Sequence, residues 1–254
     1  TQLALGANET VRDILDPLLR EYQADLLSAV NTILRTPLPD PSSQVSPHEV
    51  PIRREAILCA CRLGQTGDLW AALDNVEDPR LRSLMIDAFV DLKLSFEELR
   101  QVLPTLRPTS RQAVILGLSR RLERKPDLDR TGSLALFTEL LKTDPDSGVH
   151  SAAEYAIRTH AGAEQARQIL GSLKNTGCSN WRVLPNGLCL ITIVPPADSD
   201  VSLSGRRFEI SATEITVEQF QEYTKDVEPS LMVTTQPHCP MSNLNVFHAM
   251  RYCR

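Results

Sequence analysis

The chain repeats the pattern Pro79-Arg-Leu-Arg-Ser-Leu-Met-Ile86, in which an arginine follows a proline by three positions and leads into an apolar run. Two further copies are Pro51-Ile-Arg-Arg-Glu-Ala-Ile-Leu58 and Pro108-Thr-Ser-Arg-Gln-Ala-Val-Ile115, so the prolines lie 28 and 29 residues apart (51 to 79, 79 to 108). A looser fourth copy begins at Asp144-Pro145. Proline is favoured in the first turn of a helix, and the apolar residues after it define a buried face. Each copy therefore predicts the start of a helix.

Shorter helical patterns separate these copies, at residues 69–73, 96–103 and 134–141. The predicted unit is a helix pair of about thirty residues, and such units stack because none can bury its apolar face alone. We therefore predict HEAT-like helical repeats over residues 51–175. The alternative is an irregular helical domain in which the spacing of the prolines is a coincidence.

Residues 1–50 are predicted to form an N-terminal helix and a proline-rich loop. Apolar residues recur at helical spacing from Val11 to Leu34, and Asp16-Pro17 has the composition of a helix start. Residues 36–51 contain five prolines, which excludes a helix there and predicts a mobile loop.

The composition changes near residue 180, after which half of the twelve aromatic residues lie. A polar run at 171–180 predicts a linker or a short connection. Beyond it, residues 188–194 and 207–217 are typical of strands, and Thr216 with Gln219 would make a capping box for a following helix. Residues 245–254 predict another helix. This part of the chain is therefore predicted to be α+β.

Two segments in this part resemble the formylglycine-generating-enzyme (sulfatase-modifying factor) family. They are Thr213-Glu-Ile-Thr-Val-Glu-Gln-Phe220 and Cys239-Pro-Met-Ser-Asn-Leu-Asn-Val-Phe-His-Ala-Met-Arg-Tyr-Cys253, in the order that the family has them. Trp181 and residues 186–195 look like the family's opening strand. The sequence departs from the family where residues 198–205 replace a Met-Gly-Ser turn, and where Phe247 and His248 replace a Trp and an Asp.

The resemblance implies that residues 180–254 are the N-terminal part of a C-type-lectin-like domain. The helical part is similar to the segment that joins Ser/Thr kinase domains to such domains in bacterial signalling proteins, although this chain has no kinase loop motifs. The chain starts at Thr1 and stops at Arg254 inside a predicted helix, so we expect a fragment of a multidomain protein.

The implied activity is oxygen-dependent conversion of cysteine to formylglycine, or related oxidative sulfur chemistry, with copper or iron as the metal. The family's metal-binding cysteines lie in the part that follows Arg254, so no catalytic, cofactor-binding or metal residue is assigned within this chain. The competing hypothesis is a non-catalytic adaptor that uses the repeats and a lectin-like recognition module to bind a protein or peptide partner. A third is a self-sufficient helical scaffold.

The cysteines and histidines form no recognisable site in the sequence. Residues two apart on a helix face different ways, so Cys59 and Cys61 are predicted to be core residues, as is Cys189. Cys239 and Cys253 are predicted to be structural and Cys178 to be exposed. His150 and His160 are predicted to be solvated helix residues, and His48, His238 and His248 are scattered. No Cys-x2-Cys pair suggests zinc.

The repeated Arg54, Arg82 and Arg111 allow two interpretations. They could form a ridge that binds an acidic partner, or each could pair with a nearby carboxylate and cover its helix start. We favour the second, because an arginine gains nothing from the dipole at a helix N-terminus.

Composition limits the partners of this chain. With 27 Lys+Arg against 32 Asp+Glu the net charge is −5, which argues against nucleic acid as the main partner. No run approaches the ~20 apolar residues of a membrane span. We expect a cytoplasmic location for this chain, with any membrane anchor elsewhere in the parent protein.

Overall fold

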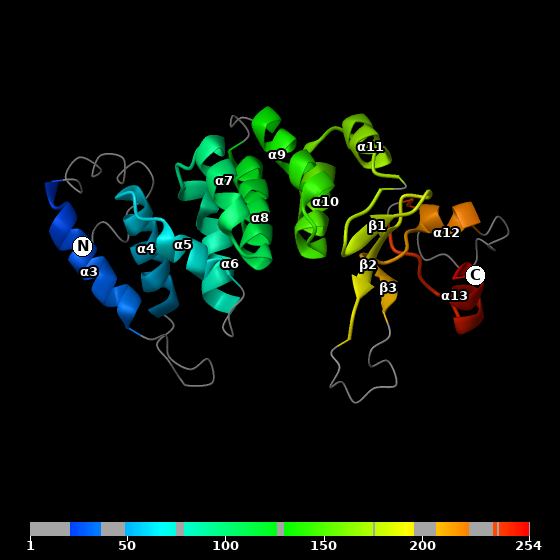
Figure 1. The fold of residues 1–254 in the computed structure, drawn as a ribbon, viewed down its shortest axis with the longest axis horizontal. Coiled ribbons are helices and arrows are strands. Elements are labelled where there is room, and N and C mark those ends of the chain that lie inside the picture. The colour runs from blue at the N-terminus through cyan, green and yellow to red at the C-terminus, as the bar shows by residue number, and fades with distance from the viewer. Residues whose placement is uncertain are drawn as a thin grey trace. The chain divides into compact units, whose positions relative to one another are not determined.

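The computed structural model describes residues 21–36, 49–74, 79–125, 130–174, 176–195, 207–223, 236–237 and 239–253. These residues are mostly helical, with one small three-stranded antiparallel sheet (Figure 1). The chain divides into two compact units. Unit 1 comprises residues 1–141 and 152–161, and unit 2 comprises residues 142–151 and 162–254.

Unit 1 is built from successive helices, as the repeated pattern predicts. Its described elements are α3 (Gln23–Arg35), α4 (Glu49–Arg62), α5 (Gly67–Ala72), α6 (Pro79–Ala88), η1 (Phe89–Asp91), α7 (Phe96–Val102), η2 (Leu103–Thr105), α8 (Pro108–Arg124), α9 (Arg130–Thr143) and most of α10 (Ser147–His160). The helices that the sequence predicts between the copies are α5, α7 and α9, although α9 has 14 residues and is as long as α4 and α10. Helices α6 and α8 begin at the predicted prolines.

In the first and fourth copies of the repeated pattern, the helix begins at a position other than the one predicted. Helix α4 starts at Glu49, so residues 49–51 are not the loop that the prolines suggested. A proline is tolerated there because N–H groups of the first turn have no partner inside the helix. Helix α10 starts at Ser147, where the Asp146 carboxylate accepts a hydrogen bond from the N–H of Val149 at 3.0 Å. The start predicted at Asp16-Pro17 and most of the predicted loop lie outside the described residues.

Consecutive helix pairs in unit 1 approach closely at Gly117. A Cβ atom on this residue of α8 would lie 2.6 Å from Cγ of Phe89, whose ring is fully buried under the helix. Glycine therefore permits η1 to pack directly on α8. Around this contact the core is formed by large side chains such as Met85, Ile115 and Leu118. The apolar faces that the repeat pattern predicted are thus buried between helices.

Unit 2 contains the sheet and three short helices. Its elements are α11 (Ala163–Gly171), β1 (Trp181–Val183), β2 (Cys189–Ile193), β3 (Phe208–Ser211), α12 (Val217–Tyr223) and α13 (Val246–Tyr252), with the first turn of α10. The strands pair antiparallel in the order β1-β2-β3. The turn between β1 and β2 includes Gly187 at φ +83°, a backbone conformation that glycine adopts without strain.

The strand predicted over residues 207–217 is shorter in the structure. Strand β3 ends at Ser211, and the backbone of Ile215 and Thr216 instead pairs with Pro240 and Met241. The alternating pattern beyond Ser211 therefore reflects packing against another segment. The run at 171–180 is a short connection, because Gly177 bridges to Arg182 and Leu173 is buried.

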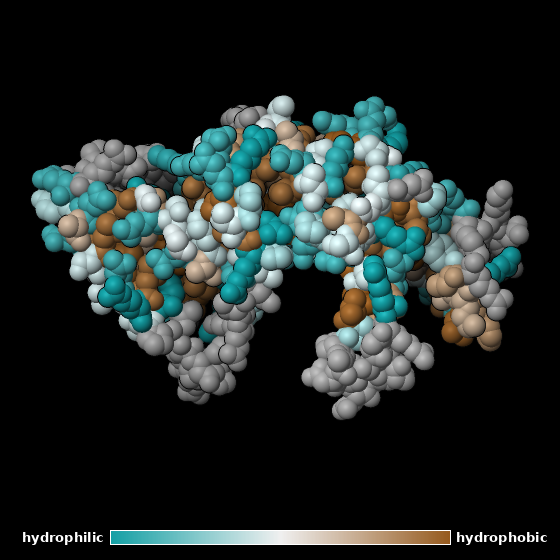
Figure 2. Space-filling view, in the orientation of Figure 1, coloured by the Kyte–Doolittle hydropathy of each residue, from teal (hydrophilic) through white to brown (hydrophobic). Residues whose placement is uncertain are grey.

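One face of the sheet is apolar and becomes more exposed from β1 to β3. Trp181, Ile191 and Ile210 lie in register across the three strands on this face. Trp181 is only 2% exposed, whereas Ile210 is 53% exposed. The opposite face carries the ion pair of Arg182 with Glu209. Apolar surface is visible over the ends of β2 and β3 and over α13 (Figure 2). No helix within the described residues is long and apolar enough to cross a membrane.

Candidate functional site

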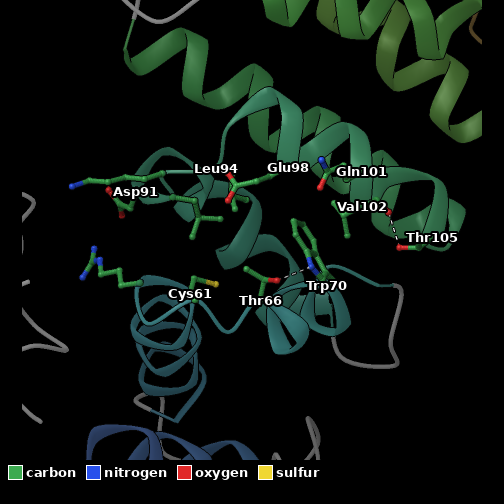
Figure 3. Close-up of a pocket in the computed structure, with 13 residues that line it drawn as sticks. Cys61, Thr66, Trp70, Asp91, Leu94, Glu98, Gln101, Val102 and Thr105 are labelled. Carbon is green, nitrogen blue, oxygen red and sulfur yellow. Dashed lines mark hydrogen bonds between the residues drawn. The ribbon is translucent and has the colours of Figure 1, made fainter. Parts of the chain in front are cut away.

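A groove of about 610 Å³ lies in unit 1 between two successive helix pairs (Figure 3). The end of α4 and the start of α5 supply one wall. The segment after η1, helix α7 and η2 supply the other. Its volume lies in the range of sites that bind small molecules or short peptide segments. The sequence by itself predicts no site at these residues.

Trp70 forms an aromatic wall of the groove. Its indole N–H donates to the hydroxyl of Thr66 at 3.2 Å, and its ring stands toward Gln101 and Val102 of α7 (Figure 3). Its carbonyl accepts a hydrogen bond at 3.3 Å from Ser110, which is buried on α8. Backbone and ring are thus both held in place, so the groove has a preformed apolar surface.

Cys61 faces the groove with a thiol that stays protonated at neutral pH. Burial, and next the nearby Asp68 carboxylate, raise the pKa of this thiol to about 12, against the opposing charge of Arg62. A thiol with so high a pKa is a poor nucleophile and a poor metal ligand. Cys59 lies instead in a core cluster with Val30 and Ala60. The core assignment is confirmed for Cys59, whereas Cys61 is half-buried and lines the groove.

The two carboxylates of the groove lining have partners within the chain. Asp91 lies 3.6 Å from the guanidinium of Arg54. Glu98 accepts hydrogen bonds from the backbone N–H and the hydroxyl of Ser95, both at 2.7 Å, in a capping box that starts α7. These bonds lower the pKa of Glu98, the backbone bond contributing most. Both side chains are therefore held by structural contacts, and the lowered pKa keeps Glu98 ionised at neutral pH.

The repeated arginines connect neighbouring elements and do not form a ridge. Arg54 contacts Glu55 at 2.9 Å as well as Asp91, which confirms the predicted carboxylate pairing for this residue. Arg82 donates instead to the carbonyls of Leu73 at 3.1 Å and Thr109 at 3.3 Å. The carboxylate prediction is wrong for Arg82, because its side chain reaches the carbonyl left free where α5 ends.

The same pattern continues in the next helix pair. Arg111 donates to the carbonyl of Leu106 at 2.7 Å, and Arg121 to that of Leu94 at 3.1 Å. Arginine suits this role because its planar fork carries several donors at fixed angles. These residues stabilise the stacking of helix pairs and hold the segment that forms one wall of the groove.

His150 and His160 are buried, so the prediction that they are solvated is wrong. His150 is 1% exposed and stacks on Trp181 with ring centroids 3.9 Å apart, while the Trp181 indole N–H donates to the carbonyl of Asp144 at 2.9 Å. His160 is 8% exposed. One available signal was their position on the apolar stripe of α10 together with Val149, Ala153 and Ile157, which are all fully buried.

Ser119 and His160 form a buried polar contact between α8 and α10. The hydroxyl oxygen of Ser119 lies 2.8 Å from Nε2 of His160. Burial lowers the pKa of His160, partly opposed by the nearby Glu123 carboxylate. A serine next to a histidine suggests a nucleophile and its base, but Ser119 is 1% exposed. A substrate has no access to it, so the contact is structural.

In unit 2 the two segments of the family resemblance meet in space. The N–H of Val217 donates to the carbonyl of Cys239 at 2.9 Å, and the N–H of Met241 donates to that of Ile215 at 2.8 Å. The rings of Phe220 and Tyr252 stack with centroids 5.5 Å apart.

The capping box predicted for Thr216 and Gln219 is confirmed. The Gln219 side chain accepts from the N–H of Thr216 at 3.0 Å, and the Thr216 hydroxyl accepts from the N–H of Gln219 at 3.3 Å. Helix α12 therefore begins where the local sequence pattern placed it.

The cysteines of unit 2 are spread over different environments. Cys189 is buried and Cys178 is exposed, as predicted. The Cys239 thiol lies 3.3 Å from the side-chain oxygen of Gln236, whereas Cys253 is exposed, which does not fit a structural role. Among the residues that the structure describes, no group of three His, Cys, Asp or Glu side chains could hold a metal ion.

The chain matches no protein-family model, no curated protein and no solved structure.

Proposed function

We propose that unit 1 is a HEAT-like scaffold that binds a segment of a partner protein in the groove beside Trp70. The observation that carries this proposal is the position of the groove at the junction of two helix pairs, with a fixed aromatic wall. Stacked helical repeats present extended surfaces of this kind to their partners. Aromatic residues held in preformed pockets are frequent anchors of protein interfaces.

The support from energetics is that the groove needs little reorganisation before it can bind. Trp70 is held by Thr66, the α7 wall by its capping box, and the loop before α7 by Arg121. Binding to an ordered surface avoids the free-energy cost of immobilising loops and side chains.

A displayed library of random peptides tests this proposal. We expect selected peptides to bind the unaltered chain and to lose at least about tenfold in affinity with Trp70→Ala, because truncation of a buried aromatic anchor costs ~2 kcal/mol or more. Tyr155→Ala is the matched control, since Tyr155 is an aromatic residue of unit 1 that is 50% exposed and outside the groove lining. Failure to select any peptide, or equal loss with both variants, would contradict the proposal.

A second proposal concerns unit 2, which we interpret as the N-terminal part of a formylglycine-generating-enzyme-like domain. What supports it is that the two resembling segments, separated in the sequence, are joined by backbone hydrogen bonds and by the Phe220–Tyr252 stack. The described residues do not fit a copper or iron site, so no residue of this chain is assigned to the metal or to catalysis. A lectin-like recognition module without catalysis is the alternative for the same unit.

An assay for aldehyde formation by the full-length encoded protein distinguishes these two roles for unit 2. If this protein is an oxidase, a cysteine-containing peptide incubated with it in air and copper will gain an aldehyde, which a hydrazide reagent labels. Incubation without oxygen should prevent the labelling. If no aldehyde forms under any of these conditions, the oxidase proposal fails and the recognition module remains.

A further inference from the structure

We infer that the groove of unit 1 recognises an acidic, apolar peptide, in which a carboxylate pairs with Arg62 and a neighbouring apolar side chain packs on Trp70. This inference rests on the proposed binding function of the groove and adds the chemical class of the partner. The evidence for it is that some charged side chains of the groove already have partners inside the chain, whereas Arg62 has none among the described residues.

The two carboxylates that line the groove have partners inside the chain. Asp91 faces Arg54, and Glu98 is held by two hydrogen bonds from Ser95. A basic partner residue would therefore have to displace an existing partner of each carboxylate. Such an exchange gains little free energy, because each new interaction replaces one that the carboxylate already makes.

Arg62 differs from these groups because it forms no ion pair with any residue that the structure describes. It is half-buried at the end of α4 and lines the groove next to the uncharged Cys61 thiol. The carbonyls at this helix end are satisfied within the chain, since the N–H of Gln65 donates to Ala60 at 2.9 Å and that of Gly64 to Cys61 at 3.0 Å. The guanidinium thus keeps donors for a carboxylate from outside, which it can bind through two parallel hydrogen bonds.

The apolar part of the ligand is set by the other side chains that line the groove with Arg62. Trp70 presents its ring on one side, and Leu94 and Val102 stand half-buried on the other (Figure 3). Polar groups nearby are occupied, because the Thr66 hydroxyl accepts from Trp70 and the Thr105 hydroxyl donates to the carbonyl of Val102 at 2.7 Å. An aliphatic or aromatic side chain therefore fits this part better than a polar one, since it leaves no polar group unpaired.

The combination excludes a nucleic acid as the natural ligand. Nucleic-acid binding depends on several cations that track successive phosphates, whereas the lining of this groove has only Arg62 and Lys93, beside the carboxylates of Asp91 and Glu98.

The test compares three peptides of equal length that alternate Leu with Glu, with Gln or with Lys. Binding is followed by the fluorescence of Trp70 in a Trp181→Phe background, because Trp70 and Trp181 are the two tryptophans of the chain. We expect the Glu peptide to bind about tenfold more tightly than the Gln peptide, the difference that one charge-assisted hydrogen-bonded pair supplies. The preference should weaken as salt is raised.

Variants of Arg62 identify the source of the preference. Arg62→Gln should remove the difference between the Glu and Gln peptides while the Gln peptide binds as before, and Arg62→Glu should favour the Lys peptide. Arg124→Gln is the matched control, because Arg124 is an exposed arginine of α8 outside the groove. Thermal unfolding of each variant monitors its fold.

Three outcomes would overturn this inference. If library-selected peptides bind at Trp70 but are not acidic, the inference fails and the proposed binding function stands. If no peptide binds, both fail. A concentration-dependent dimer that Arg62→Glu dissociates would assign the groove to a second copy of the chain.

Discussion

His160 shows how a single buried residue links stability to pH. Its ring nitrogen lies 2.8 Å from the Ser119 hydroxyl, and burial lowers its pKa in the folded state below the ordinary 6.5. The groups that face it are Glu123 on α8, which opposes this shift, and Arg130 on α9, which adds to it. The folded state therefore favours the neutral imidazole.

We predict that this contact stabilises the fold at neutral pH and loses its contribution as the pH falls. The unfolded chain takes up a proton near pH 6.5 before the folded chain does, so the free energy of unfolding falls with pH below that value. Urea unfolding at several pH values should show a steeper decline for the unaltered chain than for His160→Gln. Equal slopes for the two proteins would contradict this account of His160.

Gly117 is a second residue whose role depends on one contact. We predict that Gly117→Ala destabilises the fold by about 1–3 kcal/mol, because the new methyl group would lie 2.6 Å from the Phe89 ring. Gly171→Ala serves as the control, since no atom lies within 4 Å of a Cβ there. Chemical denaturation of both variants measures the difference, and similar midpoints would contradict the close packing of η1 on α8.

At the scale of elements, arginines join the helix pairs to one another. Arg82 of α6 donates to the backbone carbonyl of Leu73 after α5. It also donates to two oxygens on α8, the backbone carbonyl of Thr109 and the side-chain oxygen of Gln112. One side chain thus connects three elements. Helices too short to be stable alone obtain their order from such tertiary contacts.

We predict that Arg82→Met lowers the free energy of unfolding by about 1–3 kcal/mol, because it leaves buried oxygens without donors while it keeps much of the apolar stem. Arg124→Met, at an exposed site on α8, should change it by less than about 0.5 kcal/mol. Amide hydrogen exchange should show faster exchange in α5 for the Arg82 variant. Unchanged exchange there would mean that the arginine does not hold this helix.

Local chemistry explains which elements the sequence predicts correctly. Pro79 and Pro108 mark helix starts because proline at the first helical position is a property of the chain itself, independent of tertiary contacts. The capping box at Thr216 is equally local. The early end of β3 is not a local effect, because it is decided by the pairing of Ile215 with Met241, far along the chain.

The candidate site depends on contacts that the sequence does not reveal. Trp70 and Gln101 belong to different helix pairs, and their meeting in one groove follows from the stacking of those pairs. The burial of His150 depends in the same way on Trp181, a residue thirty-one positions away (150 to 181). Composition and periodicity describe a helix face but do not identify the residue that covers it.

At the scale of the whole molecule, Trp181 ties the sheet of unit 2 to residues that precede it by many positions. It stacks on His150 and donates to Asp144, at the start of α10. These contacts place residues 142–151 in the same compact unit as the sheet.

We predict that Trp181→Ala destabilises unit 2 by about 3–5 kcal/mol, the cost of truncating a fully buried aromatic residue. Unit 1 should unfold at nearly its original temperature, since its core does not include this residue. Differential scanning calorimetry would then show one transition shifted and one retained. A single transition shifted as a whole would show that the two units unfold together.

The claim at the centre of this account is that the groove beside Trp70 binds an acidic, apolar segment. The most direct measurement is the fluorescence titration of the alternating Leu/Glu and Leu/Gln peptides against the Trp181→Phe chain with Arg62 and with Arg62→Gln. We predict about tenfold tighter binding of the Glu peptide when Arg62 is present and no such preference with Arg62→Gln. Equal binding of both peptides by both proteins, or no binding at all, would contradict it.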